Sequence, residues 1–417
     1  MTYAHSLPLQ GRSHEAVMAE IAAFAAQDPD AASGRTSCYA MEGGEDIQQL
    51  IHEAYSHFFR KNALVRRYFP GYQTLEDEVH DIGASLLSGG REGVIALLTS
   101  GGTESIFCGV HAAREWARET MPQVSAPEVV APYSLHPTFS KACHYLGISV
   151  RRIPLGPDYR ADPAAIEAAI GPNTIALAGS APCWPYGLID PIADLAAIAH
   201  ARGLWMHVDA CVGGFFAPFA AKAGYPVPDY DFRLDGVMSL SADLHKYGYA
   251  AKPCSMIAFR DASLLRHHYV HPDEWPCGKY TAQGFVGSRP AGAAAAAWAV
   301  LHFLGEEGYV DLARQTMEGK RRLAEGIAAI PGLKPWKTDL GVLVYGSSDP
   351  DVSAQAIVGG LAERGWHSGG TLEPPLVHLA MDAASAAEND RYLADLADVV
   401  DRIRGGAAAS GTLSYVD

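Results

Sequence analysis

The sequence predicts an α/β protein with a large, mostly parallel sheet and a smaller α+β domain at its C-terminal end. The first observation is that short apolar runs alternate with helical patterns from residue 93 onward, an order typical of βαβ units. The second is size, because 417 residues with 48% hydrophobic content can bury the cores of two unequal domains. The third is a group of short strand and helix patterns near the C-terminal end.

An N-terminal arm and one amphipathic helix are expected over residues 1–60. The stretch up to residue 44 is rich in Ala, Gly and Ser, which indicates an arm. Apolar residues then recur at the spacing of one helix face: Ile47, Leu50, Ile51, Ala54, Tyr55 and Phe58.

The large domain is expected over residues 61–305. Its predicted strands are residues 94–99, 129–131, 174–178, 204–208, 236–240 and 255–259. The predicted helices between them are residues 105–117, 138–146 and 192–200. Continuous apolar strands of this kind are typical of a parallel sheet with helices on both faces.

The small domain is expected over residues 306–417. A long helical region over residues 293–330, broken near residues 305–308, leads into it. Strand patterns at 341–345 and 376–380 then alternate with helical patterns at 354–364 and 389–403, which predicts an α+β unit.

Charge and cysteine content exclude several classes of protein. A net charge of −15 argues against a nucleic-acid or anionic-membrane surface as the main partner. The seven cysteines form no C-x-x-C and no paired spacing, so neither disulfides nor a metal site is expected, and a cytoplasmic location is favoured. Since no segment is apolar over a bilayer-spanning length, we expect a soluble protein without an integral membrane segment.

A lysine and a carboxylate carry the main chemical signal. Lys246 follows a polar turn of small residues, and Asp209 ends an apolar run upstream of it. Such a lysine can hold the aldehyde of pyridoxal phosphate as a Schiff base, while the carboxylate keeps the pyridine nitrogen protonated. A lone lysine would by default lie on the surface, but this context favours the cofactor. Burial beside another cation would lower the pKa of Lys246.

A glycine turn provides a candidate phosphate seat. Residues 99–105, Thr-Ser-Gly-Gly-Thr-Glu-Ser, follow a predicted strand and open a helix, so backbone N–H groups and the helix dipole would face an anion. Gly101 and Gly102 let the backbone approach, and Thr103 either donates to the phosphate or caps the helix. The alternative is a tight turn without a ligand.

Two further loops are candidates for the same site. His136 lies between a predicted strand and a helix, where an imidazole stacks on a pyridine ring or simply marks the helix entry. Arg289, beside Ser288, suits a phosphate or a subunit contact. An ordinary surface turn is its alternative.

Together these motifs resemble the fold type I pyridoxal phosphate enzymes and, within them, the group II decarboxylase family, with the closest likeness to its sphingosine-1-phosphate lyase-like members. The likeness extends from about Tyr39 to Asp382. It rests on residues 99–105, His136 with Lys141, 179–182, 186–187, 190–191, 207–214, 241–252, 287–290 and 305–309. It implies a fold like that of aspartate aminotransferase.

The resemblance also implies a homodimer with active sites at the interface and a role for each matched residue. Lys246 forms the Schiff base, Asp209 meets the pyridine nitrogen and His136 stacks on the ring. His245 joins the phosphate seat, and Ser288 or Arg289 reaches the cofactor of the partner subunit. The implied cofactor site comprises Gly101, Gly102, Thr103, His136, Ser180, Asp209, Ala210, Cys211, His245, Lys246, Ser288 and Arg289.

One segment departs from the family pattern. Where the lyases carry histidine, proline and aspartate, this chain has Val65, Arg66 and Arg67, although flanking residues such as Asn62 match. That histidine faces the substrate in the lyases, so the substrate of this chain is open. The arginines either bind a second anionic group, making Asn62, Arg66 and Arg67 candidate substrate residues, or form a solvated face.

Several reactions remain open for a small-molecule amine substrate. The resemblance favours retro-aldol cleavage of a β-hydroxy amine, phosphorylated or not, over α-decarboxylation of an amino acid. Transamination ranks third, because the strand that often carries a carboxylate-binding arginine has His378 instead. Candidate proton carriers are Lys246, Lys252, Tyr247 and Tyr249.

Non-enzymatic classes stay open as well. A cofactor-binding protein without catalysis is disfavoured by the presence of both Lys246 and Asp209. A doubly wound nucleotide-binding protein is disfavoured because the first βα unit has no G-x-G-x-x-G turn.

Overall fold

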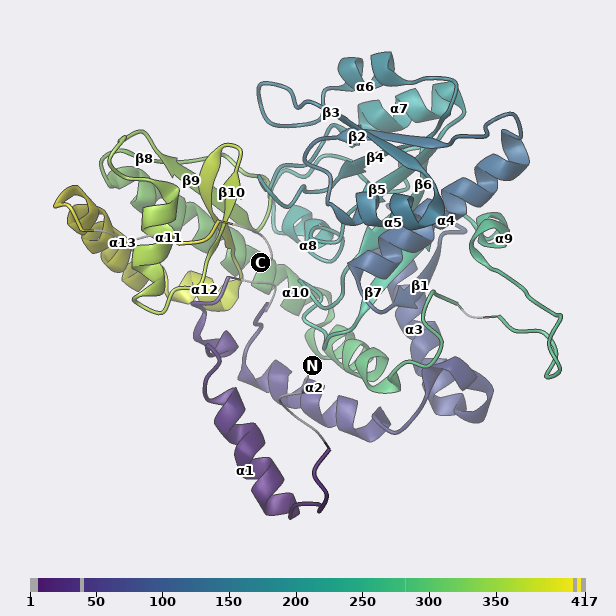
Figure 1. Cartoon of the computed structure of the whole chain (residues 1–417), viewed down its shortest axis with the longest axis horizontal. Coiled ribbons are helices and arrows are strands. Elements are labelled where there is room, and N and C mark those ends of the chain that lie inside the picture. Colours follow the sequence, from purple (N-terminus) through teal and green to yellow (C-terminus); the bar gives the residue numbers. More distant parts are fainter. Residues whose placement is uncertain (1–6, 38–40, 282, 408–410, 414–417) are drawn as a thin grey trace.

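The computed structural model describes residues 7–37, 41–281, 283–407 and 411–413. These form a large lobe and a small lobe, with the N-terminal helices crossing below them (Figure 1). Residues 1–6 at the start of the predicted arm, and residues 38–40, which include Tyr39 where the family likeness begins, lie outside the described residues.

The large lobe is built on a sheet of seven strands in the order β1-β7-β6-β5-β4-β2-β3. The strands are β1 (Ile95–Thr99), β2 (Glu128–Pro132), β3 (Ser149–Ile153), β4 (Thr174–Ser180), β5 (Trp205–Asp209), β6 (Val237–Ala242) and β7 (Ser255–Phe259). Neighbours from β6 to β3 run parallel, and β7 alone runs antiparallel to both of its neighbours. The predicted fold class is confirmed.

Helices cover both faces of this sheet. They are α3 (Pro70–Leu87), α4 (Gly102–Thr120), α5 (Thr138–Leu146), α6 (Pro163–Ala169), α7 (Ile192–Arg202), α8 (Ala217–Lys222) and α9 (Leu265–His268). Successive strand residues belong to opposite cores: Leu98 and Val130 pack on one side, Leu97 and Val129 on the other. The apolar runs therefore form strands because both of their faces are buried.

β3 is a strand that the sequence pattern did not reveal. It lies at the sheet edge beside β2, where Ser149 and Arg151 are exposed. Ile153 is its one buried residue, so it lacks the continuous apolar run by which the inner strands were recognised.

The N-terminal segment contains more helix than predicted. α1 (His14–Ala25) lies in the predicted arm and is capped by Ser13, but it buries none of its residues. α2 (Glu45–Phe58) is the predicted amphipathic helix and packs against α10 (Ala291–Ala329). Short 3₁₀ turns occur at Ala31–Ser33, Ala63–Tyr68 and Ala262–Leu264.

The small lobe has a four-stranded antiparallel sheet in the order β10-β11-β9-β8. Its strands are β8 (Leu333–Pro335), β9 (Val342–Ser347), β10 (Gly369–Leu372) and β11 (Pro375–Ala380). Its helices are α11 (Ala354–Ala362), α12 (Ala383–Ala387) and α13 (Asn389–Arg404). The predicted α+β character is confirmed.

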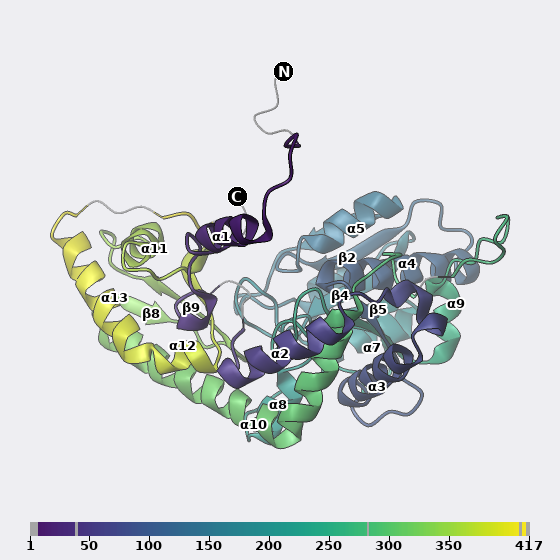
Figure 2. The same ribbon diagram turned by 90° about the horizontal axis from the view of Figure 1, so that it is seen from below.

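One helix, α10, serves both lobes, and Figure 2 shows it running beneath them. The domain boundary predicted after residue 305 falls inside it, at Gly305, whose φ is 55° and ψ is −172°. Glycine adopts this conformation readily, whereas a residue with a Cβ does not. The predicted break is thus a kink in a continuous helix.

In the described part of the chain, no helix combines the length and apolar character needed to cross a bilayer. Six cysteines lie there and are free thiols, five of them buried. Cys38 lies outside the described residues.

We predict that Gly305→Ala lowers the free energy of unfolding by about 1–3 kcal/mol, because the kink imposes a backbone conformation that alanine resists. No atom lies within 4 Å of a Cβ built at this position, so the cost comes from the backbone rather than from a clash. Urea unfolding measures it.

The matched control is Gly71→Ala, which lies in α3 and has equally open surroundings. Alanine should leave stability unchanged or raise it there, because it favours a regular helix. Equal effects of the two substitutions would show that the Gly305 backbone is not constrained.

Candidate active site

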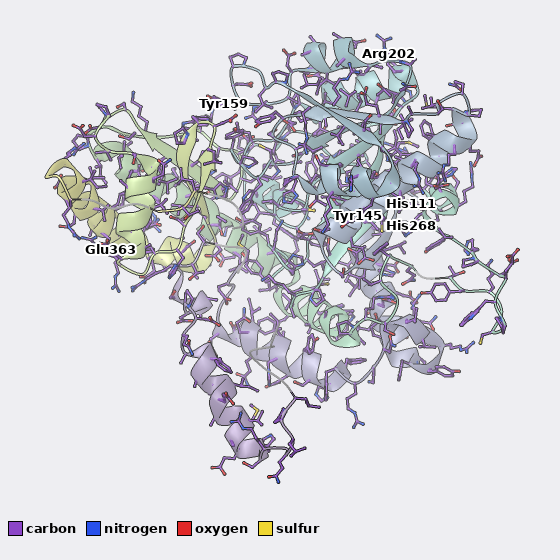
Figure 3. All side chains as sticks on the ribbon, viewed as in Figure 1. His111, Tyr145, Tyr159, Arg202, His268 and Glu363 are labelled. Atoms are coloured by element: carbon purple, nitrogen blue, oxygen red, sulfur yellow. The ribbon has the colours of Figure 1, made fainter. Side chains whose placement is uncertain are left out.

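A cavity of about 490 Å³ opens where the parallel strands end. Pro182, Asp209 and Asp243, at or just beyond the ends of β4, β5 and β6, line it together. Since the carboxyl ends of parallel strands meet at one edge of a sheet, this is the edge where α/β proteins bind ligands. Tyr145, labelled in Figure 3, lies on the α5 side of the cavity.

Lys246 lies in this cavity with a carboxylate that the sequence analysis missed. Its Nζ is 3.0 Å from Oδ2 of Asp243, and both side chains are largely buried. Burial by itself lowers the pKa of Lys246. The nearby groups, led by Asp243 and Cys211, raise it by more than burial lowers it, so the pKa lies above its usual value. The expectation of a lowered pKa is therefore wrong for the protein without a ligand, because the nearest charge is an anion.

The position of Asp243 follows from β6. The strand ends at Ala242, and Asp243 comes next, where its Oδ1 accepts a hydrogen bond from Ser255 Oγ at 2.5 Å. Burial by itself raises the pKa of Asp243. The nearby groups, led by Lys246 and His245, lower it by more than burial raises it, so the pKa lies below its usual value. A carboxylate directly after a strand and three residues before the lysine was the signal available in the sequence.

Asp209 lies on the neighbouring strand. Its carboxylate accepts the Cys211 N–H at 3.1 Å and the Ser241 hydroxyl at 3.3 Å, and it is 7% exposed. Both donors are neutral groups, so neither takes the place of a cationic partner for this carboxylate in the cavity.

The glycine turn forms the start of α4 and faces the same cavity. The N-cap residue is Gly101, and no side chain of the described residues caps the helix. Thr103 is therefore not the cap but a residue of the first turn that lines the cavity. A Cβ at Gly102 would lie 2.8 Å from Cys211 Sγ, so glycine is required for this close approach. The uncapped N–H groups make an anion site.

His136 completes the set that the sequence predicted. Its Nδ1 accepts the Thr138 N–H at 3.2 Å, and burial lowers its pKa, which keeps the ring neutral. The guanidinium of Arg152 holds the loop by donating to the carbonyls of Leu135 and His136 and, at 3.0 Å, to Ser140 Oγ. The imidazole is thus fixed in one orientation at the cavity.

Glu104 is a second carboxylate that the sequence analysis did not single out. It accepts backbone N–H groups from Ser100 at 2.6 Å, Phe285 at 2.5 Å and Val286 at 3.1 Å. Phe285 then packs on Phe107 with ring centroids 4.8 Å apart. Glu104 therefore ties a distant loop to the phosphate seat and makes that loop a wall of the cavity.

Several predicted residues do not line the cavity: Ser180, Ala210, Tyr249, Lys252, Ser288, Arg289, Asn62, Arg66 and Arg67. Ser180 is buried, and its Oγ has no hydrogen-bond partner among the described residues. Tyr249 is buried against Tyr309, whereas Lys252 is exposed. Tyr247 donates its hydroxyl to the Met381 carbonyl at 2.6 Å, which joins the two lobes.

Arg66 and Arg289 share one buried counter-ion, Glu76. Arg66 Nε lies 2.7 Å from Glu76 Oε2, and Arg289 Nη2 lies 3.2 Å from Glu76 Oε1. Arg66 also pairs with Asp77. Arg66 therefore matches neither a substrate-binding group nor a solvated face, because its charge is paired within the protein. Arg67 is exposed, with its guanidinium 4.9 Å from the centre of the Tyr68 ring, and fits the solvated alternative.

The residues that do meet in the cavity suit pyridoxal phosphate. Lys246 offers an amine for the aldehyde, and Asp209 offers a carboxylate for a protonated ring nitrogen. The uncapped start of α4 offers N–H groups for a phosphate, and His136 offers a flat neutral ring.

Comparisons with known proteins agree with this chemistry. Residues 33–332 match the family described as "Pyridoxal-dependent decarboxylase conserved domain". The chain is 35% identical over 407 residues to a sphingosine-1-phosphate lyase of Dictyostelium discoideum, covering 97% of this chain and 76% of the relative. It is 37% identical over 362 residues to one of Oryza sativa subsp. japonica, covering 85% and 66%. The chain thus spans about two thirds to three quarters of these relatives.

Solved structures give the same result. The sphingosine-1-phosphate lyase of Burkholderia pseudomallei superposes with a TM-score of 0.90 at 34% identity, covering 97% of this chain and 94% of that one. A glutamate decarboxylase of Lactobacillus brevis superposes with a TM-score of 0.84 at 18% identity, covering 98% and 97%, which shows a shared fold.

We predict that Lys246→Ala abolishes the visible absorbance band of protein-bound pyridoxal phosphate, because the buried amine beside Asp243 is lost. Lys252→Ala is the matched control, since Lys252 lies outside the cavity, and it should retain the band. Absorbance spectra after incubation with the cofactor measure both. A band that persists without Lys246 would assign the attachment to another lysine.

We predict that Arg66→Met lowers the free energy of unfolding by roughly 2 kcal/mol, because Glu76 stays buried with one counter-charge fewer. Arg67→Met should leave stability within about 0.5 kcal/mol, as expected for an exposed side chain. Urea unfolding gives both values. An unchanged stability for Arg66→Met, with weaker binding of an anionic amine, would instead make Arg66 a substrate residue.

Proposed function

The chain belongs to the family of pyridoxal-dependent decarboxylases, and from this premise we propose that it cleaves a carbon–carbon bond of a β-hydroxy amine, phosphorylated or not. It is a pyridoxal phosphate-dependent lyase by its likeness to sphingosine-1-phosphate lyases over nearly the whole chain. The observation that carries the proposal is that Lys246, Asp209 and His136 meet in one cavity of this lyase-like fold.

The residues of the cavity divide the work of holding the cofactor. Lys246 would attach it, Asp209 would keep the ring nitrogen protonated, and His136 would lie against the ring. The start of α4 would hold the phosphate through backbone N–H groups, with His245 beside it. When bound, pyridoxal phosphate supplies an electron sink for the negative charge left when a bond to the amine-bearing carbon breaks.

Proton transfer falls to the groups that reach the cavity. Retro-aldol cleavage needs a base that removes the proton of the β-hydroxyl group. Of the predicted carriers, Lys246 lines the cavity, and Asp243 Oδ2 at 3.0 Å stabilises the amine once it is protonated. Tyr249 and Lys252 lie elsewhere in this protomer. Lys246, when its amine is neutral and not attached to the cofactor, is therefore the base we propose.

The walls suit an amine with both apolar and anionic parts. Ile106, Phe107 and Phe285 give one apolar side, while Lys141 brings an ammonium group to the cavity from the exposed face of α5. An apolar portion of the substrate gains from burial against the aromatic rings. An anionic group would be drawn toward the lysine.

Decarboxylation of an amino acid is the second candidate. It is supported by a relative described as a probable L-aspartate decarboxylase of Pyrococcus furiosus, 34% identical over 328 residues. Among the described residues that line the cavity none is an arginine, so a substrate carboxylate would find no bidentate partner there. This favours the lyase. A cofactor-binding protein without catalysis is disfavoured, because an amine, a carboxylate and an imidazole converge in one cavity.

We also propose a cytoplasmic homodimer with active sites at its interface. Phe285 and Tyr145 line the cavity, yet they are 71% and 66% exposed, as expected for apolar surfaces that a second subunit covers. Ser288 is exposed outside the cavity of its own protomer, where it can reach a neighbour, whereas Arg289 is paired with Glu76. The six free cysteines of the described residues support a reducing compartment.

We predict that the enzyme loaded with pyridoxal phosphate releases an aldehyde from a phosphorylated long-chain amino alcohol. A panel of amino acids, aspartate and glutamate included, should release no CO₂. Aldehyde trapping and CO₂ release measure the two reactions, and Lys246→Ala serves as the inactive control. CO₂ without aldehyde would establish the decarboxylase instead.

A further inference from the structure

The small sheet presents one of its faces to the large lobe. Along β11, Leu376 and Ala380 join the core shared with the large lobe, whereas Val377 and Leu379 belong to the core of the small lobe. This alternation is the period of a strand, so His378 points in the same direction as Leu376 and Ala380. A histidine thus interrupts an apolar face between the lobes.

His378 contacts the large lobe through a hydrogen bond and a ring contact. Its Nε2 donates to the main-chain carbonyl of Trp184 at 2.9 Å, and its ring packs on the Trp184 ring with centroids 4.4 Å apart. His378 is 2% exposed, and burial lowers its pKa to about 4, so the ring is neutral. It therefore offers no cation to a substrate carboxylate.

Trp184 belongs to a short segment, residues 182–187, that lines the cavity at one end and contacts the small lobe along its length. Pro182 and Trp184 line the cavity. Tyr186 donates its hydroxyl to the Glu373 carbonyl at 2.5 Å, and the Asp339 N–H donates to the Gly187 carbonyl at 2.9 Å.

An aromatic cluster closes the same junction. Tyr159, labelled between the lobes in Figure 3, packs on Tyr186 with centroids 5.2 Å apart and on Trp336 with centroids 4.5 Å apart. The segment 182–187 thus takes its position from groups of both lobes.

Packing alone does not explain a histidine at this position. A buried polar group costs free energy unless it is hydrogen-bonded, whereas leucine would fill the apolar face without that cost. What histidine adds is a directional contact to one carbonyl and one ring, both of Trp184.

We propose that His378 is a positioning residue that fixes Trp184 as a wall of the substrate cavity and makes amine binding depend on the placement of the small lobe. The consequence for amine binding rests on the proposed function, whereas the anchoring of Trp184 does not. His378 touches neither cofactor nor substrate in this role. Its effect is transmitted through the hydrogen bond and the ring contact.

Three variants test this role in the full-length enzyme. His378→Leu removes the donor and keeps the volume, whereas His378→Gln keeps a donor for the Trp184 carbonyl. Val377→Ala is the control for general weakening of β11, because Val377 faces the small-lobe core. Thermal unfolding records the loss of stability in each.

The first readout is acrylamide quenching of Trp184 fluorescence, taken as the difference between each protein and its Trp184→Phe counterpart. We expect stronger quenching in His378→Leu and values near wild type in His378→Gln and Val377→Ala. A Trp184 signal unchanged in His378→Leu would overturn the inference, whatever substrate the enzyme uses.

The second readout is the concentration of phosphoethanolamine that half-shifts the absorbance of the bound cofactor. Loss of one hydrogen bond predicts an increase of about tenfold in His378→Leu, with recovery in His378→Gln and unchanged affinity for pyridoxal phosphate in all variants. An equal increase in Val377→Ala would reduce His378 to a structural role. If phosphoethanolamine does not shift the cofactor absorbance of the wild-type protein, the proposed function is contradicted. The quenching of Trp184 fluorescence then still decides the inference about His378.

Discussion

A buried ammonium–carboxylate pair, Lys246 with Asp243, sets the electrostatics of the cavity. Each charge is tolerated away from water because the other lies 3.0 Å away. Asp243 follows the end of β6, and the next turn returns Lys246 to it, so the pair depends on where that strand stops. Asp209 ends the adjacent parallel strand, which places a second carboxylate at the same edge. The ends of the parallel strands thus place Asp243, Lys246 and Asp209 together, and no long loop is needed to do so.

The two lobes complete the cavity by different means. Within the large lobe, Glu104 collects backbone N–H groups and holds the loop of Phe285 against the start of α4. Across the junction, His378 meets Trp184, and Tyr247 reaches the Met381 carbonyl from the residue after the lysine. The reactive lysine is therefore one residue away from a contact that joins the lobes. A shift of the small lobe would therefore change the contacts of Trp184 and of Tyr247, the residue next to Lys246.

The residues found from the sequence share one property. Asp209 is the last residue of its strand, while Lys246, His136 and the turn at Gly101 and Gly102 follow a strand within a few positions. The structure brings all of them to one cavity. A chemically distinctive residue after an apolar run is a local signal, and the parallel arrangement of the strands makes such local signals converge. The strand pattern failed only where burial was incomplete, as at β3.

The sequence by itself determined the α/β fold, the cofactor chemistry and the lysine, because periodicity and motifs lie within short stretches of chain. Only the tertiary structure decided which partner each long side chain found. The sequence left Arg66 as either an anion-binding group or part of a solvated face, yet packing gives it the buried Glu76. Glu104 and Phe285 are 181 residues apart, and His378 and Trp184 are 194 apart. No local pattern encodes such pairs, since they form only when packed elements bring them into contact.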